Sequence, residues 1–431
     1  MLGLLFAACL AFCSQADPGT NSFQVIPNSP LGKTGANSAC TTPICLSLLS
    51  MIEGAKSSID FAIYGLRGQP EVLEALQRAE KRGVQVRGVV DKDLEGKSYY
   101  SDTPLLEKKL SNVRSDHAYD QETARILSGR RNSGNSRDCS RPFGAEGPLQ
   151  CFEGKGYASE EEIQFVGDIM HNKFFIVDKR FVWTGSANIS DTGIGGYNAN
   201  LVALIDSPEV AAFYATEFNQ MFEGGEFHRR KSKLKKADLQ AILPEGIVRL
   251  YFSPQGYAVR RGVLPLIEQA NESIDIAMFF LTHKAISKAL VEAHERGVDI
   301  RVILDATGAT NGYSKHGYLR ENGISVKVEN WGGKMHMKAA IFDGKHLALG
   351  SMNWTAAGEK NNDENLIVVR DASKTARAVT VFYDSLWVAI PDRWLNEDPS
   401  PESPASGTAC TDSLDNDFDN LVDSGDPGCA R

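Results

Sequence analysis

The sequence predicts an α/β fold with two pseudo-symmetric halves. Residues 170–188, MHNKFFIVDKRFVWTGSAN, and residues 335–353, MHMKAAIFDGKHLALGSMN, share Met, His, Lys, Asp, Gly, Ser and Asn at a constant offset of 165. Residues 52–91 also resemble residues 267–305. A repeat of this reach indicates two copies of one supersecondary unit, and 431 residues suffice for two such halves.

Each half begins with a strand, a helix and a second strand. Residues 52–64, IEGAKSSIDFAIY, and residues 267–279, IEQANESIDIAMF, end in apolar runs typical of buried strands. An amphipathic helix, a glycine at its C-cap and another apolar run follow in residues 71–91 and 285–305. This order predicts a parallel βαβ unit in each half.

The repeated motif predicts a β-hairpin. In the first copy, His171 and Lys173 lie two residues apart, on one side of a strand. His171 is seven residues before Asp178 and Gly185 is seven after it, so a turn at Asp178 brings Gly-Ser-x-Asn beside His-x-Lys. The Asp, at the far end of the hairpin, is better placed to brace the turn than to touch a substrate.

These residue types suit a phosphate ester. Lysine and asparagine donate hydrogen bonds to phosphate oxygens, serine adds a hydroxyl, and histidine acts as nucleophile or proton shuttle. Two copies form one site, in which one histidine attacks phosphorus, the other protonates the leaving oxygen, and lysines neutralise charge without a metal. The candidate catalytic residues are His171, Lys173, His336, Lys338, Asn188 and Asn353, with Ser186 and Ser351 as phosphate-binding residues and Asp178 and Asp343 as structural supports.

The two His-x-Lys-x4-Asp-x6-Gly-Ser-x-Asn copies resemble the motifs of the phospholipase D superfamily, over most of residues 45–390. The resemblance implies two halves, each a mixed sheet flanked by helices, with the active site at their interface. It assigns His171 as the nucleophile and His336 as the acid and base.

The superfamily often carries a downstream carboxylate or carboxamide that holds a histidine. Glu364, 28 residues after His336, matches this position and joins the catalytic candidates. The same offset in the first half gives Ala199, so Asn198, Asn200 or a backbone carbonyl is expected to hold the first histidine.

The leading hypothesis is a phospholipase D-type hydrolase of phospholipid headgroup esters that acts through a phospho-histidine. The alternatives are a metal-independent endonuclease, a phosphatidyl transferase similar to cardiolipin synthase, and a non-enzymatic calcium-dependent binding protein. We therefore expect a phospholipid or membrane surface as partner, with nucleic acid second, and no cofactor for catalysis. Both a monomer and a dimer stay open.

The N-terminus predicts export. Residues 1–16 combine an apolar run from Leu2 to Phe12 with the small residues of a signal-peptidase site, and we expect cleavage after Ala16. A lipoprotein signal at Cys9 and a buried N-terminal helix are the alternatives. Secretion, or a periplasmic or cell-envelope location, follows. Three local cysteine pairs suit disulfides in an exported protein: Cys40 with Cys45, Cys139 with Cys151, and Cys410 with Cys429.

The domain boundaries follow from composition and from the repeat. They are a first half at 22–225 with an insertion at about 105–160, a basic linker at 226–246, a second half at 247–395, a Pro/Ser-rich linker at 396–409 and an Asp-rich tail at 410–431. The length and the polar, glycine-rich sequence of the insertion predict either a functional loop or a disordered surface segment. The basic stretch 229–236 is expected to be a solvated linker, with nucleic acid or lipid headgroups as its alternative partners.

The tail predicts a calcium site. Five aspartates occupy positions 1, 3, 5, 9 and 12 of a calcium-loop spacing: Asp415, Asp417, Asp419, Asp423 and Asp426. Position 6 departs from the EF-hand pattern, because it is Asn420 rather than glycine. An acidic solubilising tail is the alternative. The tail also holds most of the net charge of −9, so the main body is close to neutral.

Overall fold

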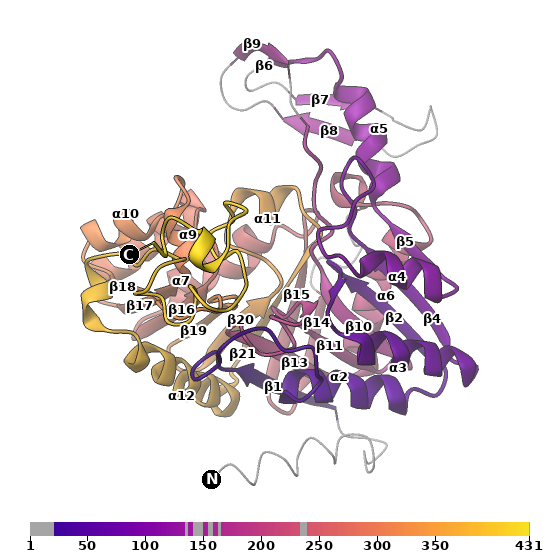
Figure 1. Ribbon diagram of the computed structural model, residues 1–431, viewed down its shortest axis with the longest axis horizontal. Coiled ribbons are helices and arrows are strands. Elements are labelled where there is room, and N and C mark those ends of the chain that lie inside the picture. Colours follow the sequence, from indigo (N-terminus) through magenta and orange to yellow (C-terminus); the bar gives the residue numbers. More distant parts are fainter. Residues whose placement is uncertain are drawn as a thin grey trace.

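The protein consists of two lobes, each built on one mixed β-sheet (Figure 1). The computed structural model describes residues 21–133, 137–140, 150–153, 158–162, 165–232 and 239–430, and only the backbone within 132–164. The expected signal peptide at 1–16 lies outside these residues and stays a prediction.

The first sheet has seven strands, in the order β1-β13-β11-β10-β2-β4-β5. Their bounds are β1 Ser22–Asn28, β2 Ser58–Ile63, β4 Gln85–Val90, β5 Val113–Ser115, β10 Lys173–Val177, β11 Phe181–Gly185 and β13 Asn200–Asp206. The strands β2, β4 and β5 run parallel, whereas β10, β11 and β13 pair antiparallel. The predicted βαβ unit and hairpin are therefore both confirmed. Two short strands, β3 Leu66–Arg67 and β12 Ile189–Ser190, form a separate parallel pair.

The second sheet has eight strands, in the order β14-β15-β21-β20-β19-β16-β17-β18. Their bounds are β14 Leu239–Leu243, β15 Gly246–Ser253, β16 Ser273–Met278, β17 Asp299–Leu304, β18 Ser325–Val328, β19 Lys338–Phe342, β20 His346–Gly350 and β21 Glu364–Arg370. It repeats the parallel unit and the antiparallel hairpin of the first sheet. The sheet begins at β14, inside the stretch 226–246 that the sequence assigned to a linker.

Helices cover both faces of each sheet. In the first half, α2 Pro43–Gly54 and α3 Pro70–Lys81 pack on the outer face, and α6 Pro208–Phe222 packs on the other. In the second half, α7 Leu264–Gln269 and α8 Lys284–Glu295 are outside, and α12 Ser373–Ala389 lies on the inner face. The shorter helices are α4 Thr103–Lys109, α9 Ala306–Thr310, α10 His316–Glu321, α11 Ala356–Lys360, η1 His228–Arg230, η2 Val259–Val263, η3 Asp392–Leu395 and η4 Asp423–Gly425.

One hydrophobic core joins the halves. It contains Phe174 and Phe218 of the first half together with Leu349 and Tyr383 of the second, all buried. Two further cores fill the outer layers of the two lobes. Because burial of apolar surface is the main stabilising term, this shared core holds the two sheets in a fixed relation.

The insertion projects from the first lobe (Figure 1). It comprises α5 His117–Leu127 and the strands β6 Arg131–Ser133, β7 Arg137–Ser140, β8 Gln150–Glu153 and β9 Ala158–Glu162. The elements α4 and β5 have counterparts in α10 and β18, so the extra residues begin at α5 rather than at residue 105. Residue counts between motifs give the size of an insertion and not its position. Cys139 and Cys151 lie opposite each other in the β7–β8 pair, but their side chains are outside the described residues.

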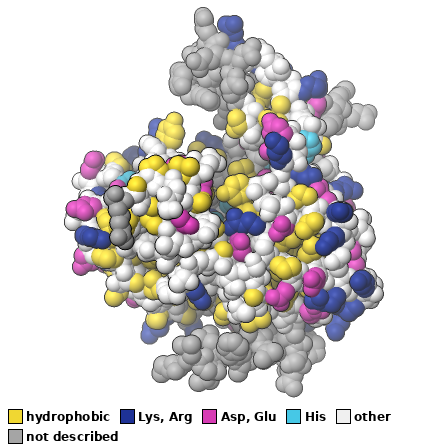
Figure 2. All heavy atoms as spheres, viewed as in Figure 1, with side chains coloured by type: hydrophobic (Ala, Val, Ile, Leu, Met, Phe, Trp, Pro, Cys, Tyr) yellow, Lys and Arg dark blue, Asp and Glu magenta, His cyan; other side chains and the backbone are white. Residues whose placement is uncertain are grey.

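The C-terminal segment packs against the second lobe and reaches the inter-lobe hollow (Figures 1 and 2). Glu402 and Ser406 of the Pro/Ser-rich stretch are fully buried, so this stretch is not a loose linker. Disulfides join Cys40 to Cys45 and Cys410 to Cys429, as the sequence predicts. Within the described ranges, no helix has both the length and the apolar character to cross a membrane.

Candidate active site

The two halves exchange main-chain hydrogen bonds beside their histidines. His171 N donates to Asp363 O at 3.0 Å, and His336 N donates to Ala199 O at 3.0 Å. Each histidine strand thus pairs with the segment that precedes the last strand of the other sheet, forming the bridges Met170–Asp363 and Ala199–Met335. This reciprocal pairing brings side chains that are far apart in sequence to one site.

Each histidine is therefore held by a residue of the other half. His171 Nδ1 lies 2.9 Å from both carboxylate oxygens of Glu364, and His336 Nδ1 lies 3.2 Å from Asn200 Oδ1. Glu364 and Asn200 occupy equivalent positions, because each is the first residue of its strand, β21 or β13. The equivalent of Glu364 is thus Asn200 and not Ala199. The connection before β13 is one residue longer than that before β21. Counting the same number of residues from each histidine therefore gives Ala199 and misses Asn200.

The motif serines support these partners. Ser351 Oγ donates to Glu364 Oε2 at 2.6 Å, and Ser186 Oγ donates to Asn200 Oδ1 at 2.9 Å. Both serines are buried. Their expected role in binding phosphate stays a prediction, but their hydroxyls already orient the groups that hold the histidines.

A cavity of about 380 Å³ opens at both histidines. Asn188 and Asn353 also line it, and their Oδ1 atoms have no hydrogen-bond partner within the described part of the chain. Asn188 Nδ2 donates to the hydroxyl of Tyr100 at 2.9 Å, which fixes one of these amides. The cavity therefore combines two histidines with two amides that keep bonding capacity for a ligand.

Each motif lysine supports its own histidine. Lys173 Nζ donates to His171 O at 2.8 Å, and Lys338 Nζ donates to His336 O at 2.8 Å. Both ammonium groups also lie over aromatic rings, Lys173 over Tyr64 and Lys338 over Phe279. Such buried cations can offset the charge of an incoming phosphate.

Burial shifts the ionisation of this cluster. It lowers the pKa of Lys173 to about 7 and raises the pKa of Glu364 to about 8. Burial, followed by the two lysines, lowers the pKa of His171 and of His336 well below the usual value. Desolvation favours neutral forms, whereas a bound anion favours the protonated cations. The site is therefore poised to gain protons when a negatively charged ligand enters.

Two aspartates that the sequence analysis did not single out brace the histidine strands. Asp91 Oδ1 accepts from Met170 N at 2.8 Å, and Asp305 Oδ2 accepts from Met335 N at 2.8 Å. The signal was present, because an Asp directly follows the second strand of both repeats. Asp178 and Asp343 lie at the far hairpin turns, where each accepts several backbone N–H groups.

The basic stretch is partly buried under the site. Lys231 forms ion pairs with Glu217 and with Asp363 Oδ1, the latter at 2.8 Å, and all three side chains are inaccessible to solvent. His228 donates its backbone N–H to Asp363 at 2.8 Å. The expectation of a solvated linker is therefore wrong for residues 228–231. Residues 233–238 lie outside the described ranges. The composition of this stretch shows that it is basic. It does not show that Asp363 and Glu217, from distant segments, supply buried carboxylates for Lys231.

The family model "Cardiolipin synthase, PLD-like domain" matches residues 48–222 and 263–387, most of the chain. The chain belongs to the phospholipase D superfamily. The paired His-x-Lys motifs that meet at the lobe interface are thus the superfamily's motifs in their folded arrangement.

Relatives support this membership. "Phospholipase D" of Rickettsia bellii is 30% identical over 159 residues, which is 37% of this chain and 77% of that protein. Human "Mitochondrial cardiolipin hydrolase" is 32% identical over 147 residues, which is 34% of this chain and 57% of that protein. The phosphatidylserine synthase structure of Haemophilus influenzae has a TM-score of 0.54 at 14% identity, covers 87% of this chain and 89% of its own, and shows the fold alone.

Proposed function

We propose that the protein is a phosphodiesterase of the phospholipase D type, which hydrolyses headgroup esters of glycerophospholipids. The observation that carries this proposal is the asymmetric support of the two histidines at one cavity: a carboxylate holds His171 and a carboxamide holds His336. The first support suits a nucleophile and the second suits an acid.

The first step forms a phospho-histidine. Because Nδ1 of each histidine faces its partner, Nε2 is the nitrogen left for the substrate. His171 Nε2 attacks phosphorus, the bond from phosphorus to the headgroup oxygen breaks, and that oxygen takes the proton from His336 Nε2. The Glu364 carboxylate stabilises the positive charge that develops on His171, which an amide would do less well.

The second step hydrolyses the phospho-histidine and regenerates the free enzyme. His336 Nε2, now unprotonated, takes a proton from water while the water oxygen attacks phosphorus. The phosphorus–nitrogen bond breaks and the product leaves with a free phosphate monoester. Lys173 and Lys338 offset the charge on the equatorial oxygens throughout. An alcohol in place of water would give transfer instead of hydrolysis.

The rim of the cavity favours a lipid. Tyr99, Ile169 and Phe418 line the cavity and are exposed to solvent by 60%, 36% and 49%. Val166, three residues before Ile169, is 83% exposed. Figure 2 shows hydrophobic side chains on both sides of the hollow between the lobes. Exposed apolar residues around a polar cavity are suited to an amphiphilic substrate at a membrane surface.

Lipid hydrolysis can be tested directly on vesicles. The full-length protein is incubated with vesicles of phosphatidylcholine, phosphatidylglycerol and cardiolipin, with Ca²⁺ added, and lipid products are measured by mass spectrometry. We expect phosphatidic acid from the wild type. His171→Asn and His336→Asn should give only the background measured without enzyme. Cleavage of plasmid DNA without phosphatidic acid from any vesicle would overturn the lipid assignment in favour of a nuclease. Transfer to an added alcohol, without hydrolysis, would make the protein a transferase.

A further inference from the structure

The Asp-rich tail forms part of the wall of the active-site cavity. Leu414, Asp415, Asn416 and Phe418 line the same cavity as His171 and His336. The backbone here is anchored to the second lobe, because Asn416 O accepts from Thr307 Oγ1 at 2.7 Å and from Lys334 Nζ. The tail is thus not a module separate from the two lobes.

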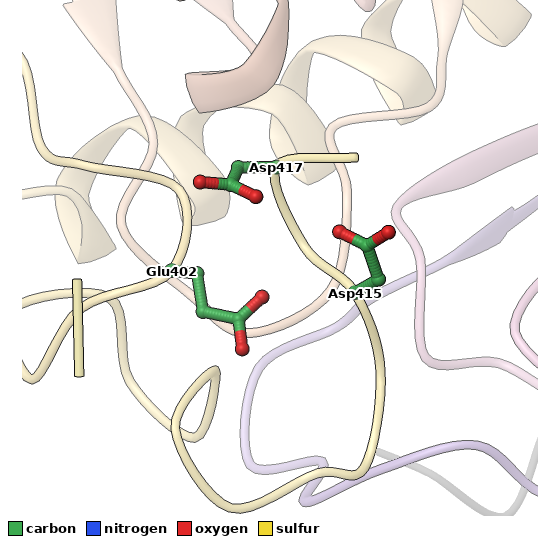
Figure 3. Close-up of side chains that lie close together, drawn as sticks. All are labelled: Glu402, Asp415 and Asp417. Carbon is green, nitrogen blue, oxygen red and sulfur yellow. The ribbon is translucent and has the colours of Figure 1, made fainter. Parts of the chain in front are cut away.

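Five carboxylates gather at this wall. Those of Glu402, Asp415 and Asp417 lie within 4.8 Å of one another, as do those of Asp417, Asp419 and Asp426. Figure 3 shows the first three directed toward a common space. Asp417 belongs to both groups, so the five form one continuous cluster. Glu402 comes from the Pro/Ser-rich stretch, outside the predicted loop.

The carboxylates of this cluster have no ion-pair partner among the described residues. No ion pair connects these five carboxylates to a lysine, arginine or histidine within the described part of the chain. Asp426 is only 3% exposed, yet its Oδ2 has no hydrogen-bond partner among the described groups. A buried carboxylate oxygen without a donor is costly unless a cation meets it. The unpartnered Asp426 Oδ2 is therefore a second observation, besides the clustering, that favours a bound cation.

We propose that Glu402, Asp415, Asp417, Asp419 and Asp426 bind Ca²⁺ and that the ion fixes the cavity wall from Leu414 to Phe418. Oxygen ligands from an irregular loop suit Ca²⁺, which accepts six to eight of them in flexible geometry, better than the strictly octahedral Mg²⁺. Asp417 and Asp419 belong to the carboxylate cluster, while Asn416 and Phe418, which alternate with them, line the cavity. Ordering the ligands therefore orders the wall.

This geometry differs from the EF-hand spacing in one testable way. Asp423, the residue at loop position 9, accepts from Ser413 N with both carboxylate oxygens at 3.2 Å and is in neither group. The buried Glu402 takes its place in the cluster. The spacing predicts that Asp423 is a ligand and does not include Glu402. In the structure Glu402 belongs to the carboxylate cluster and Asp423 does not.

Calcium binding is measured by calorimetry on chelator-treated full-length protein titrated with Ca²⁺ alone. We expect a Kd between about 10⁻⁵ and 10⁻³ M, as for extracellular calcium modules and weak sensors. Asp417→Asn and Glu402→Gln should weaken binding about tenfold or more. Asp423→Asn and the exposed control Asp299→Asn should retain it. Undetectable binding by the wild type, or equal binding of Mg²⁺, would overturn the proposal.

Folding is checked separately. Ca²⁺ should raise the unfolding temperature of the wild type and of Asp299→Asn, and should raise that of Asp417→Asn less. Because this comparison uses the wild type with and without the ion, it stays informative if one variant folds poorly. No shift in the wild type would contradict the site.

The link to the cavity rests on the proposed function and has its own measurement. Chelation should raise KM for a vesicle phospholipid severalfold and leave kcat nearly unchanged, because the ion orders the wall and touches no reacting atom. Hydrolysis with an unchanged KM would refute the effect on the wall. Calcium binding without any hydrolysis would instead refute the proposed function and leave the ion site standing.

Discussion

His171 and Glu364 form a pair across the interface of the two halves, with Nδ1 lying 2.9 Å from both carboxylate oxygens. The two residues are 193 positions apart in the chain. The bond depends on the main-chain pairing of His171 with Asp363, the neighbour of Glu364. Neither half can therefore hold its motif histidine alone, so the two copies form one joint site and not two independent sites.

Glu364→Gln should strongly impair catalysis. Glutamine keeps an oxygen for His171 Nδ1 but removes the charge that stabilises the phospho-histidine. We expect kcat/KM for bis-p-nitrophenyl phosphate to fall about 10²-fold or more. Steady-state kinetics measures this, and Glu359→Gln, which removes a carboxylate that faces His283 instead, is the matched control. A loss of less than threefold would mean that the carboxylate is not part of the mechanism.

The pH profile should also change in Glu364→Gln. Burial raises the pKa of Glu364 to about 8, so its active, ionised form is lost as the pH falls through that value. Burial lowers the pKa of Lys173 to about 7, so its protonated form is lost as the pH rises. The wild-type kcat/KM should therefore peak between these values. In the variant the decline on the acid side should vanish, and its persistence would assign that limb to another group.

Asn200→Asp should shift the alkaline limb of kcat. This parameter reports the enzyme–substrate complex, in which His336 supplies the proton, whereas the limb assigned to Lys173 belongs to kcat/KM of the free enzyme. Asn200 Oδ1 lies 3.2 Å from His336 Nδ1, and a carboxylate there favours the imidazolium. The pKa of His336 should rise, so the protonated acid persists to higher pH, by about one to two units. Measuring kcat against pH in both proteins tests this. An unchanged alkaline limb of kcat would show that His336 does not supply the proton.

The nucleophile can be identified by trapping. In His336→Asn, a p-nitrophenolate leaving group needs no protonation, so the first step proceeds while hydrolysis of the intermediate lacks its base. We expect a phosphorylated peptide that contains His171, detected by mass spectrometry after an alkaline quench. His171→Asn should give no such peptide. A label on His336 in His171→Asn would reverse the two roles.

Much of this site was predictable because its residues repeat. The His-x-Lys and Gly-Ser-x-Asn elements lie seven residues either side of a turn, so their meeting follows from strand geometry. The helix after β2 and the glycine that follows it, Gly83 with φ of 87°, obey local rules of amphipathicity and capping.

The partners of the histidines were harder to predict, because they depend on packing between halves. A one-residue difference in a connecting segment hid the equivalence of Asn200 and Glu364, and no local rule states that each histidine is held from across the interface. Lys231 illustrates the same limit. A basic run looks solvated until Glu217 and Asp363, from distant segments, are brought beside it.

Lys231→Met should destabilise the protein strongly. The change leaves the Glu217 and Asp363 carboxylates buried without their cation, and losing one partner of such a cluster costs about 3–5 kcal/mol. Denaturant unfolding measures the loss. Lys345→Met is the control, because Lys345 pairs with Glu272 at the surface, at 3.4 Å, where a pair contributes at most about 1 kcal/mol. Equal effects would show that burial of the cluster is not what matters.

Asp178→Asn should destabilise the fold without removing a catalytic group. The Asp178 carboxylate accepts backbone N–H groups of Lys56, Ser57 and Ser58 at 2.7–3.1 Å. Partial burial opposes ionisation, but these donors outweigh it and lower the pKa of Asp178. Its ionised form therefore stabilises the fold above the ordinary carboxyl pKa of about 4, and that contribution is lost as the pH falls through the lower, folded pKa.

The expected loss in Asp178→Asn is about 1–3 kcal/mol at neutral pH, because an amide keeps one weaker acceptor. The difference from wild type should shrink as the pH is lowered below about 4, since wild-type Asp178 then also becomes neutral. Denaturant unfolding at a series of pH values measures both effects, with Asp299→Asn as the exposed control. Hydrolysis by the folded variant should stay near the wild-type rate, because the Asp178 carboxylate binds the turn before β2 and not the cavity. A difference independent of pH would assign the stabilisation to packing of the side chain instead of its charge.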